Sequence, residues 1–524
     1  MDVANIYIFL IALLISYITA VNAEDMPCSP KRFPNRSVVC VCNSSYCDKI
    51  TREIPECGYA INYASSEGGL RFKKTVLRFE SCDTEPLQSS DTITLVINPS
   101  VTHQSIEGFG GAVTDSAAMN WKRLSDSKAQ QHLINSYCGS SGIQYNMIRV
   151  PMGASDFSTR LYTYDDLQGN DTTLKNFALQ PEDVYYKIPM IKACMKAAKT
   201  TVKVIGSCWS PPTRMKTTHK FTGLTRLLDE FYQPFANYYL KFVQEYNKAK
   251  VPIWAVTTGN EPLNGIAGFG GLNDLGWTIS GMCKWVRDYL SPTLRNNSDV
   301  KILAVDDQRF TIPLWITMVA RQCAGYMKAF DGVGLHYYFD ETVPVSIIHE
   351  SLKDYPNLFL INTEACTGVQ TTPSVDLGSW DRAETYIRNM FEDLNNKFVA
   401  WVDWNMCLSM TGGPNWENNF VDSPIIVNAE KNEFYKQPMF YAIGHFSKFI
   451  PRHSVRIDVR DPSKCPEAPP SILNVAFKTP QNTIVVVIYN RENMTKSVIL
   501  KLGNRQISLD VGPKTIITVE MHNE

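Results

Sequence analysis

Two glutamates each follow a short apolar run, and carboxyl groups in that position are well placed for chemistry. Glu261 lies in "TGNEP", shortly after the run "IWAVTT", and Glu364 lies in "LFLINTEA". A protonated and an ionised carboxyl group can together cleave an acetal, because one donates a proton to the leaving oxygen and the other meets the cationic carbon. Mutual repulsion and unequal hydrogen bonding can hold two such groups in different protonation states.

Either glutamate alone is most simply explained as an ordinary strand-end residue in a salt bridge. The two are 103 positions apart, which corresponds to three strand-and-helix units of about 34 residues each. Because the same residue type recurs at two strand ends of one series, coincidence is a poor explanation. The sequence therefore favours a catalytic pair, Glu261 and Glu364, facing one pocket.

Aromatic and polar residues stand near other strand ends of the same series. Aromatic faces bind the apolar side of a sugar ring, and core packing is their alternative role. These candidates are Trp209, Trp401, Trp404, Trp416, Tyr337 and Tyr338. The candidates for binding sugar hydroxyl groups are Asp115, Arg149, Asn260, Asn405 and Asn419. His336 is expected to orient a carboxylate, and because no second His or Cys stands at ligand spacing, we predict no metal site.

The elements that position these residues can be read from the apolar runs. Eight runs between about residues 105 and 448 are each followed by a helix-length amphipathic stretch, which predicts a (β/α)8 barrel of the α/β class. A doubly wound open sheet is the alternative, but no G-x-G-x-x-G motif follows an early strand. Strand-like segments before the barrel and after about residue 454 predict an antiparallel β-sandwich built from both flanks.

The first 23 residues, with an apolar run from about Ile6 to Ala20 and small residues after it, predict a cleaved signal peptide. A membrane anchor is the alternative, but the run is shorter than a span of roughly 20 residues. N-glycosylation sequons support the secretory pathway, and they begin at Asn35, Asn43, Asn170, Asn296 and Asn493. The sequence does not distinguish a lysosomal protein from a secreted one.

Four of the 14 cysteines crowd together near the N-terminus and predict a two-disulfide knot: Cys28, Cys40, Cys42 and Cys47. Three pairings are possible, and a zinc site is a poor rival because the spacing is wrong and no His is near. Cys57 and Cys82 could form a further bridge. Cys194, Cys208 and Cys366 lie in apolar segments and are expected to be buried free thiols.

Length and charge limit the number of domains and the kinds of partner that this protein can have. A chain of 524 residues with 44% hydrophobic residues can form two or three domains. With 51 basic and 52 acidic residues, the chain has no excess of positive charge that would indicate a nucleic-acid partner.

Longer motifs resemble a known family. "EGFGGAVTDSAA", "YNMIRVPM", "TGNEP", "DDQR", "LINTEACTG", "WVDWN", "GGPNWENNFVDSPIIV" and "FYKQPMFYAIGHFSKFIP" are similar, in this order, to the glucosylceramidases of glycoside hydrolase family 30. The likeness runs from Cys28 almost to the C-terminus. It implies a retaining β-glucosidase that cleaves glucosylceramide with no cofactor.

The resemblance also implies a domain plan and site roles. A small disulfide-knotted sheet domain is expected at residues 24–51 with part of 406–437, the β-sandwich at 52–100 and 454–524, and the barrel at 101–405 and 438–453. Glu261 is expected to be the acid/base and Glu364 the nucleophile, with Arg149 and His336 supporting them. The residues expected to bind the glucosyl unit are Asp115, Trp209, Asn260, Tyr338, Trp404 and Asn419.

Partners follow from the same resemblance. A glycolipid at a membrane or micelle surface is the expected substrate, with a saposin-type activator protein, an anionic lipid and a homodimer left open, and the lysosome as the expected compartment. Two other functions remain open. The same machinery could act on another β-glycoside, such as a steryl glucoside or a β-xyloside, or the chain could bind and transport glycolipid without cleaving it.

Overall fold

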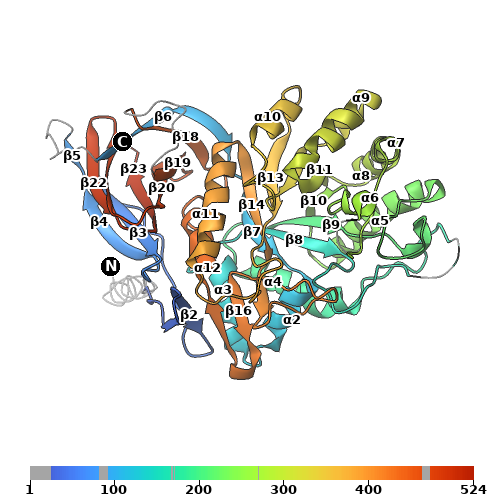
Figure 1. Cartoon of the computed structure of the whole chain (residues 1–524), viewed down its shortest axis with the longest axis horizontal. Helices are drawn as coiled ribbons and strands as arrows, with labels where there is room; N and C mark the ends of the chain where they lie inside the picture. The colour runs from blue at the N-terminus through green and yellow to red at the C-terminus, as the bar shows by residue number, and fades with distance from the viewer. Residues whose placement is uncertain are drawn as a thin grey trace, which may run out of the picture.

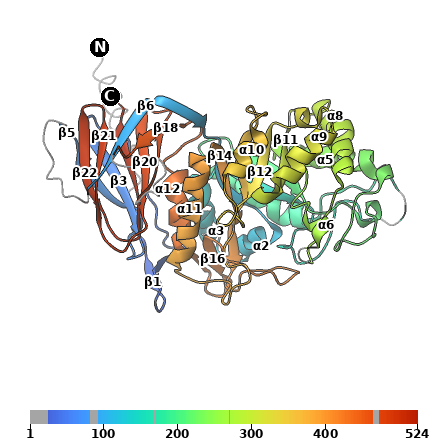
Figure 2. The same ribbon diagram turned by 45° about the horizontal axis from the view of Figure 1, so that its top comes forward.

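The computed structural model describes residues 25–81, 92–166, 169, 171–268, 271–462 and 472–523. Three β-sheets organise these residues (Figures 1 and 2), with the barrel and the sandwich side by side and helices α11 (Trp380–Asn395) and α12 (Pro438–Ser447) where they meet. The predicted signal peptide, the sequon at Asn170 and Cys82 of the suggested Cys57–Cys82 bridge lie outside the described residues.

Eight parallel strands form a closed barrel, which confirms the predicted fold class. Each of the eight apolar runs contains one strand: β7 (Gly108–Ala112), β8 (Met147–Met152), β9 (Lys203–Cys208), β10 (Ile253–Thr257), β11 (Lys301–Gln308), β12 (Gly332–His336), β13 (Phe359–Glu364) and β14 (Phe398–Asn405). β14 pairs with β7 and closes the ring. Gly110 permits the close approach of β7 to β8, since a Cβ atom there would lie 2.0 Å from the carbonyl oxygen of Met147.

Side chains of alternate strand residues fill the barrel interior. One cluster joins residues of several strands: Met147, Ile205, Ala255, Leu303, Ile361, Ala400 and Val402. The intervening residues, such as Val204, Val256 and Ile302, belong to the larger core that also includes the surrounding helices. The barrel is therefore packed below its C-terminal edge, as this fold requires.

The helices around the barrel present one apolar face to it. They include α2 (Asp115–Arg123), α3 (Ser127–Cys138), α4 (Ile188–Ala197), α5 (Tyr232–Lys248), α6 (Asn264–Ala267), α7 (Ile279–Lys284), α8 (Ser291–Arg295), α9 (Val319–Gln322) and α10 (Ser346–Leu352). In α5, for example, Tyr239, Phe242, Val243 and Tyr246 are buried at helical spacing. Ser379 is the N-cap of α11, and its side chain accepts a hydrogen bond from the backbone N–H of Arg382.

The sandwich domain combines strands from both flanks of the barrel. Its ten strands have the order β4–β3–β23–β20–β19–β18–β6–β21–β22–β5. Their bounds are β3 (Tyr59–Ser66), β4 (Lys73–Arg78), β5 (Glu80–Ser81), β6 (Ile93–Ser105), β18 (Val455–Arg460), β19 (Ile472–Lys478), β20 (Thr483–Asn490), β21 (Lys496–Leu502), β22 (Arg505–Val511) and β23 (Thr515–His522). All pairs are antiparallel except β6 with β21.

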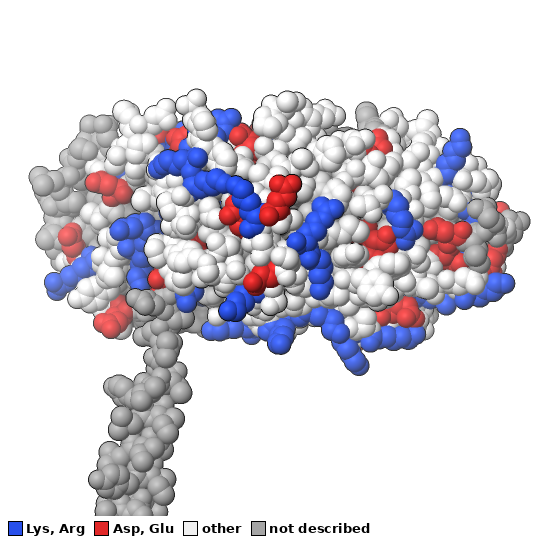
Figure 3. Space-filling model, turned by 90° about the horizontal axis from the view of Figure 1, so that it is seen from below, with Lys and Arg blue, Asp and Glu red and all other residues white. Residues whose placement is uncertain are grey.

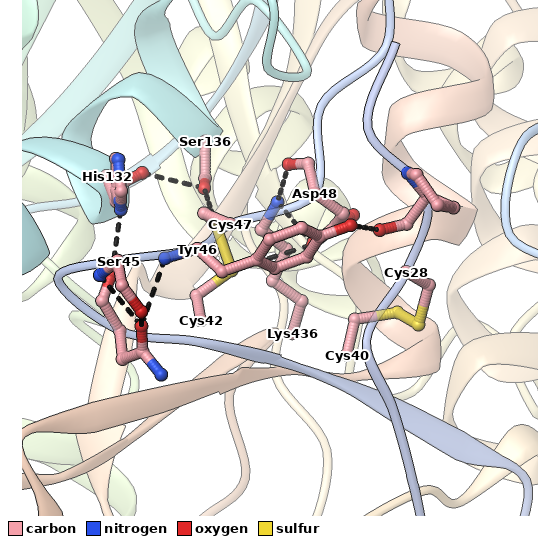
Figure 4. The surroundings of a disulfide bond; sticks show 12 residues. Cys28, Cys40, Cys42, Ser45, Tyr46, Cys47, Asp48, His132, Ser136 and Lys436 are labelled. Atoms are coloured by element: carbon pink, nitrogen blue, oxygen red, sulfur yellow. Dashed lines mark hydrogen bonds and ion pairs between the residues drawn. A yellow bond between two sulfur atoms is a disulfide. The ribbon is translucent and has the colours of Figure 1, made fainter.

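A third sheet holds the N-terminal cysteine knot. Its strands are β1 (Pro30–Arg32), β2 (Val38–Cys42), β15 (Cys407–Ser409), β16 (Ile425–Asn428) and β17 (Glu433–Lys436). The predicted knot contains disulfides Cys28–Cys40 and Cys42–Cys47, one of the three pairings left open (Figure 4). Asp48 forms an ion pair with the buried Lys436 at 3.0 Å, and this contact fixes the knot to β17 (Figure 4).

The prediction that Cys194 is a free thiol was wrong. Cys194 of α4 forms a disulfide with Cys138 of α3, and their Cα atoms are 5.4 Å apart because the two helices are neighbours around the barrel. A further disulfide joins Cys283 and Cys323. Cys208 and Cys366 are buried free thiols, as expected.

The surface carries both signs of charge, and Lys, Arg, Asp and Glu side chains are interspersed on the face shown in Figure 3. Asn35, Asn296 and Asn493 of the sequons are exposed, and Asn43 is half-buried. Within the described ranges, the search for a helix long and apolar enough to cross a bilayer found none.

Candidate active site

A cavity of about 1180 Å³ opens at the C-terminal ends of the barrel strands. It brings together most of the predicted site residues, and its lining includes Trp209, Asn260, Glu261, Tyr338, Glu364, Trp404 and Asn419. The volume is typical of a site that encloses a small molecule. The candidate active site therefore lies where the (β/α)8 fold places its chemistry.

The two glutamates face each other in this cavity. Glu261 lies four residues after β10, and Glu364 is the last residue of β13. A carboxylate oxygen of Glu261 lies within 4.8 Å of one from Glu364. Their side chains are 14% and 7% exposed, so both are accessible from the cavity but largely removed from water. This spacing leaves room for one covalently held carbon and not for an intervening water.

Glu364 is held by two donors, one on each oxygen. Nη1 of Arg149 donates to Oε2 at 2.6 Å, and the hydroxyl of Tyr338 donates to Oε1 at 2.6 Å. Both contacts fix the orientation of its side chain, which suits a group that must meet a substrate in one geometry.

Glu261 accepts hydrogen bonds from three other side chains. Gln308 and His336 donate to Oε1 at 2.7 and 2.8 Å, and Asn264 donates to Oε2 at 2.8 Å. Burial raises the pKa of Glu261, but the bonds and charge of His336 outweigh burial and lower it below its ordinary value. The backbone of Glu261 has a φ of +43°, a strained conformation that turns the side chain back over the barrel.

Arg149 on β8 connects the site beneath the glutamates. It is completely buried and donates to Glu364, to Asn260 at 2.7 Å and to Asp306 at 2.9 Å. The rings of Trp209 and Trp404 lie 5.0 and 5.4 Å from its guanidinium carbon. Because the two rings also stack at 5.2 Å, they form an apolar wall that keeps water from the cation.

Asp306 is a site residue that the sequence reasoning missed. Its carboxylate accepts hydrogen bonds from Arg149, from Ser207 at 2.5 Å and from His336 at 3.2 Å. Burial raises its pKa, but the charge of Arg149 and the bond from His336 hold it far below the ordinary value. The acidic pair in "DDQR" at the end of β11 was the available signal.

A distortion of β11 directs Asp306 into the site. Val305 and Asp306 have φ values of +72° and +51°, and the pairing with β12 shifts register between Val305 and Asp307. A β-branched residue in this conformation is strained, and such strain is typical of positions where the backbone must redirect a side chain.

His336 lies between Glu261 and Asp306, bonded through Nδ1 to the first and through Nε2 to the second. Burial lowers the pKa of His336, but Glu364, Asp306 and Glu261 outweigh burial and raise it to about 10. The imidazole is therefore positively charged at neutral and acidic pH, and it balances part of the negative charge in the site.

A group of three potential ligand atoms, from Glu261, His336 and Glu364, fits within 4.8 Å. Such a spacing could hold a metal ion, but these carboxylates already bond to Arg149, Tyr338 and the protonated His336. Two buried cations thus occupy the positions from which a metal would neutralise the site.

Asp115 does not lie in the cavity, contrary to expectation. It is 1% exposed and bonds to Ser158 at 2.6 Å, Tyr162 at 2.9 Å and Lys187 at 3.3 Å. Asp115 is the first residue of α2, and its carboxylate accepts from Ser158 and Tyr162 of the loop after β8. In this structure the side chain therefore holds the loop, and Asp115 is not among the residues that line the cavity.

Asp156 on this same loop is the acid that reaches the cavity. Its Oδ2 accepts a hydrogen bond from Asn419 at 3.1 Å, which places two polar groups for ligand hydroxyls side by side. Burial raises the pKa of Asp156 to about 7, with the negative charge of Glu364 adding to this effect. Trp401 and Asn405, two other sequence candidates, are buried in the core.

The outer half of the cavity is lined by apolar residues and has a polar side. Phe310 and Phe339 meet edge to face at 5.2 Å and are 36% and 48% exposed. Leu263 and Val369 also line the cavity, together with residues that carry hydroxyl and amide groups, such as Thr371 and Asn418. The lining therefore offers both apolar and polar contacts to a ligand.

Comparisons with known proteins agree with this geometry. Residues 106–450 match the glycosyl hydrolase family 30 TIM-barrel domain, and residues 453–519 match the family 30 beta sandwich domain. The sequence is 39% identical over 477 residues to lysosomal acid glucosylceramidase of Mus musculus, covering 89% of this chain and 90% of that protein.

Solved structures share the fold. SrfJ from Salmonella typhimurium has a TM-score of 0.79 at 22% identity, covering 89% of this chain and all of that one. The endo-beta1,6-glucanase BT3312 has a TM-score of 0.77 at 22% identity, covering 89% of this chain and 99% of that one. With both domains matched in sequence and an extended match to a curated relative, this chain belongs to glycosyl hydrolase family 30.

Proposed function

We propose that this protein is a retaining β-glucosidase that hydrolyses glucosylceramide to glucose and ceramide. The observation that carries the proposal is the approach of Glu261 and Glu364 to within 4.8 Å in one cavity. Retaining glycosidases place their carboxyl groups about 5 to 5.5 Å apart, whereas inverting enzymes separate them by about 6.5 Å or more. The similarity to a lysosomal acid glucosylceramidase supports this choice of substrate.

In the first step, Glu364 attacks the anomeric carbon while Glu261 donates its proton to the oxygen of ceramide. The C–O bond to ceramide breaks, and a covalent glucosyl ester forms on Glu364. Glu261, now ionised, takes a proton from water, and the resulting hydroxide equivalent displaces Glu364 and releases glucose. Arg149 and Tyr338 hold Glu364 in line throughout and stabilise it as the departing carboxylate.

The inner half of the cavity supplies the glucose contacts. Asp156 with Asn419, and Asn260, offer hydrogen-bonding groups for the hydroxyls, and Trp209 with Trp404 offers an aromatic wall. The outer half suits ceramide, because its apolar residues and hydroxyl groups match an acyl amide with a long chain. The exposed Phe310 and Phe339 at the rim would contact lipid when the substrate is presented at a membrane or micelle surface.

The pKa of Glu261 sets the pH range. The acid form is required for the first step, and His336 lowers the pKa of Glu261, so this form is abundant only in acid. Activity should therefore decline as the pH rises toward neutrality, which agrees with a lysosomal location. A saposin-type activator, an anionic lipid and a homodimer remain predictions from the family resemblance.

The test is hydrolysis of an aryl β-glucoside and of glucosylceramide in micelles at acidic pH. Glu364→Gln should lose several orders of magnitude in kcat, and Glu261→Gln should lose about 10²- to 10⁴-fold on glucosylceramide. Glu384→Gln is the matched control, because Glu384 pairs with Lys514 away from the cavity. A 2-fluoroglucoside should label Glu364, as shown by peptide mass.

The outcomes separate the alternatives. Full activity in Glu364→Gln, or a label on another residue, would refute the assignment of the nucleophile. A kcat/KM higher for a β-xyloside or a steryl glucoside than for glucosylceramide would keep the mechanism and change the substrate. Tight glycolipid binding with no glucose release would instead indicate a transport protein.

A further inference from the structure

A second cavity, of about 400 Å³, is lined by residues of helix α11 and of the sandwich domain. Helix α11 lies beside β19 of that domain (Figure 1). α11 contributes Arg388, Phe391, Glu392 and Asn395, and the sandwich contributes Arg456, Val459, Leu473, Asn474 and Arg491. Glu261, Glu364 and Tyr338 line the other cavity, and no residue of the catalytic mechanism lines this one. A ligand bound here would therefore take no part in the reaction chemistry.

Positive charge dominates the described residues that line this cavity: three arginines face a single carboxylate, Glu392. The carboxylate of Glu392 already forms an ion pair with another residue, Arg309, at 2.5 Å. Among the described residues, Arg456 donates to neutral amide oxygens, those of Gln104 at 3.2 Å and Asn395 at 3.4 Å. Burial lowers the pKa of Arg456, and the negative charge of Asp458 offsets this effect only in part.

Arg388 leaves a donor unused at the same site. One of its terminal nitrogens pairs with the exposed Glu341, but within the described part of the chain its Nε is buried and has no hydrogen-bond partner. A buried guanidinium N–H without an acceptor is costly and calls for an explanation, such as a ligand. Arg491 stands exposed at the rim of the cavity and can reach a ligand from the solvent side.

A neighbouring histidine reports the same excess of positive charge. The pKa of His103 is lowered, first by burial and then by Arg456, Lys397 and Arg460, with Asp458 alone among its neighbouring charges acting in the opposite direction. Lys397 and Arg460 do not line the cavity, so positive charge extends beyond its lining residues.

We propose that this cavity binds a tetrahedral oxyanion, a phosphate or a sulfate, either free or as the end group of a monoester. Guanidinium groups present paired N–H donors that match such oxygens, and the terminal N–H groups of Arg456 and Arg491 would donate to an oxyanion. Phe391, Val459 and Leu473 form an apolar surface beside the arginines, where the organic part of an ester would pack. A ligand so held would contact both α11 and the sandwich, and would stabilise the folded chain.

The experiment compares anions at constant ionic strength, with sodium chloride as the reference. Isothermal titration and thermal unfolding are measured for the full chain with inorganic sulfate, inorganic phosphate and phenyl phosphate. Saturable binding and a rise in Tm above the chloride reference are expected. Phenyl phosphate binding more tightly than inorganic phosphate would identify an ester as the ligand, whereas equal affinities would identify the free anion.

Arg456→Gln and Arg491→Gln should each weaken binding by about tenfold or more, while hydrolysis of an aryl β-glucoside stays unchanged. Arg321→Gln removes the same charge from an exposed residue that does not line the cavity, and it should leave binding as in the unmodified protein. Equal affinity and equal Tm rise in all three variants, or no saturable binding to the unmodified protein, would overturn the proposal. The glucosidase assay fails or succeeds separately, so the two proposals are tested independently.

Discussion

The positive charge of His336 should stabilise the folded protein, and it can be titrated away. His336→Gln keeps hydrogen-bond donors near Glu261 and Asp306 but removes the charge that both carboxylates surround. The folded-state pKa is raised, so the stabilisation is complete below the unfolded-state pKa of about 6.5 and is lost as the pH rises toward about 10. The free-energy difference between the unmodified protein and His336→Gln should therefore shrink across this interval.

The size of the change follows from the two pKa values. The pKa of His336 rises from 6.5 to about 10, and at about 1.4 kcal/mol for each pKa unit this corresponds to about 5 kcal/mol. The side chain is completely buried, so solvent screening removes little of this amount. Between these limits, the difference in unfolding free energy should fall by at most about 1.4 kcal/mol for each pH unit.

The assay is urea unfolding of both proteins at several pH values from 6 to 10. Comparison with the variant cancels the titration of groups common to both. His445→Gln is the matched control, because burial lowers the pKa of His445 to about 3, and that residue is neutral throughout the interval. A difference for His336→Gln that stays constant from pH 6.5 to 10 would refute the reasoning, since it would mean that His336 is uncharged in the folded protein.

Three further predictions concern other parts of the molecule. Asp156→Asn should lower kcat/KM for an aryl β-glucoside by about 10-fold through loss of a hydrogen bond to a ligand hydroxyl, with little change in Tm. Asp115→Asn should instead lower the free energy of unfolding by about 1 to 3 kcal/mol, because buried hydrogen bonds are weakened while Lys187 keeps its ion pair with Asp183. Kinetics and urea unfolding of both variants measure this contrast, and equal effects of the two substitutions would contradict it. Replacing Cys138 and Cys194 by serine opens a loop of 56 residues and should cost about 4 kcal/mol, measured by urea unfolding, and an unchanged midpoint would contradict it. The pH profile of kcat/KM should decline above acidic pH as Glu261 loses its proton, and a profile level from pH 4 to 9 would exclude Glu261 as the acid.

The barrel and its two glutamates could be predicted from the sequence, because both depend on local patterns. An apolar run of strand length identifies a buried strand, and the fold places the residue after it at the catalytic edge. Glu261 and Glu364 satisfied this rule and lie together in the structure. The eight strands were found for the same reason, since every run alternated with a helix-length segment.

The same rule could not distinguish Asp115 from Asp156. Each follows a strand by a few residues, and only the path of the chain decides which side chain enters the cavity. Asp115 begins a helix directly after β7 and is turned beneath the loop, whereas Asp156 lies on that loop. Asp306 was missed because a register shift within β11 directs it inward, and no residue type signals such a shift in advance.

The disulfide between Cys138 and Cys194 was missed for a different reason. Its residues lie in separate helices, and their pairing depends on consecutive helices being neighbours around the barrel. The predicted fold contains this information, but an apolar segment by itself is typical of a free buried thiol. The N-terminal knot was easier to recognise, because its four cysteines are close in the sequence.

The pairing of β3 with β23 has a consequence for how the protein is made. Residues 59–66 leave the ribosome long before their partner strand, residues 515–522, is translated. In that interval, the edge of β3 that will receive β23 has unsatisfied backbone donors and acceptors, which is the kind of exposed strand that recruits other chains. A chain truncated before residue 515 would keep this edge of β3 unpaired.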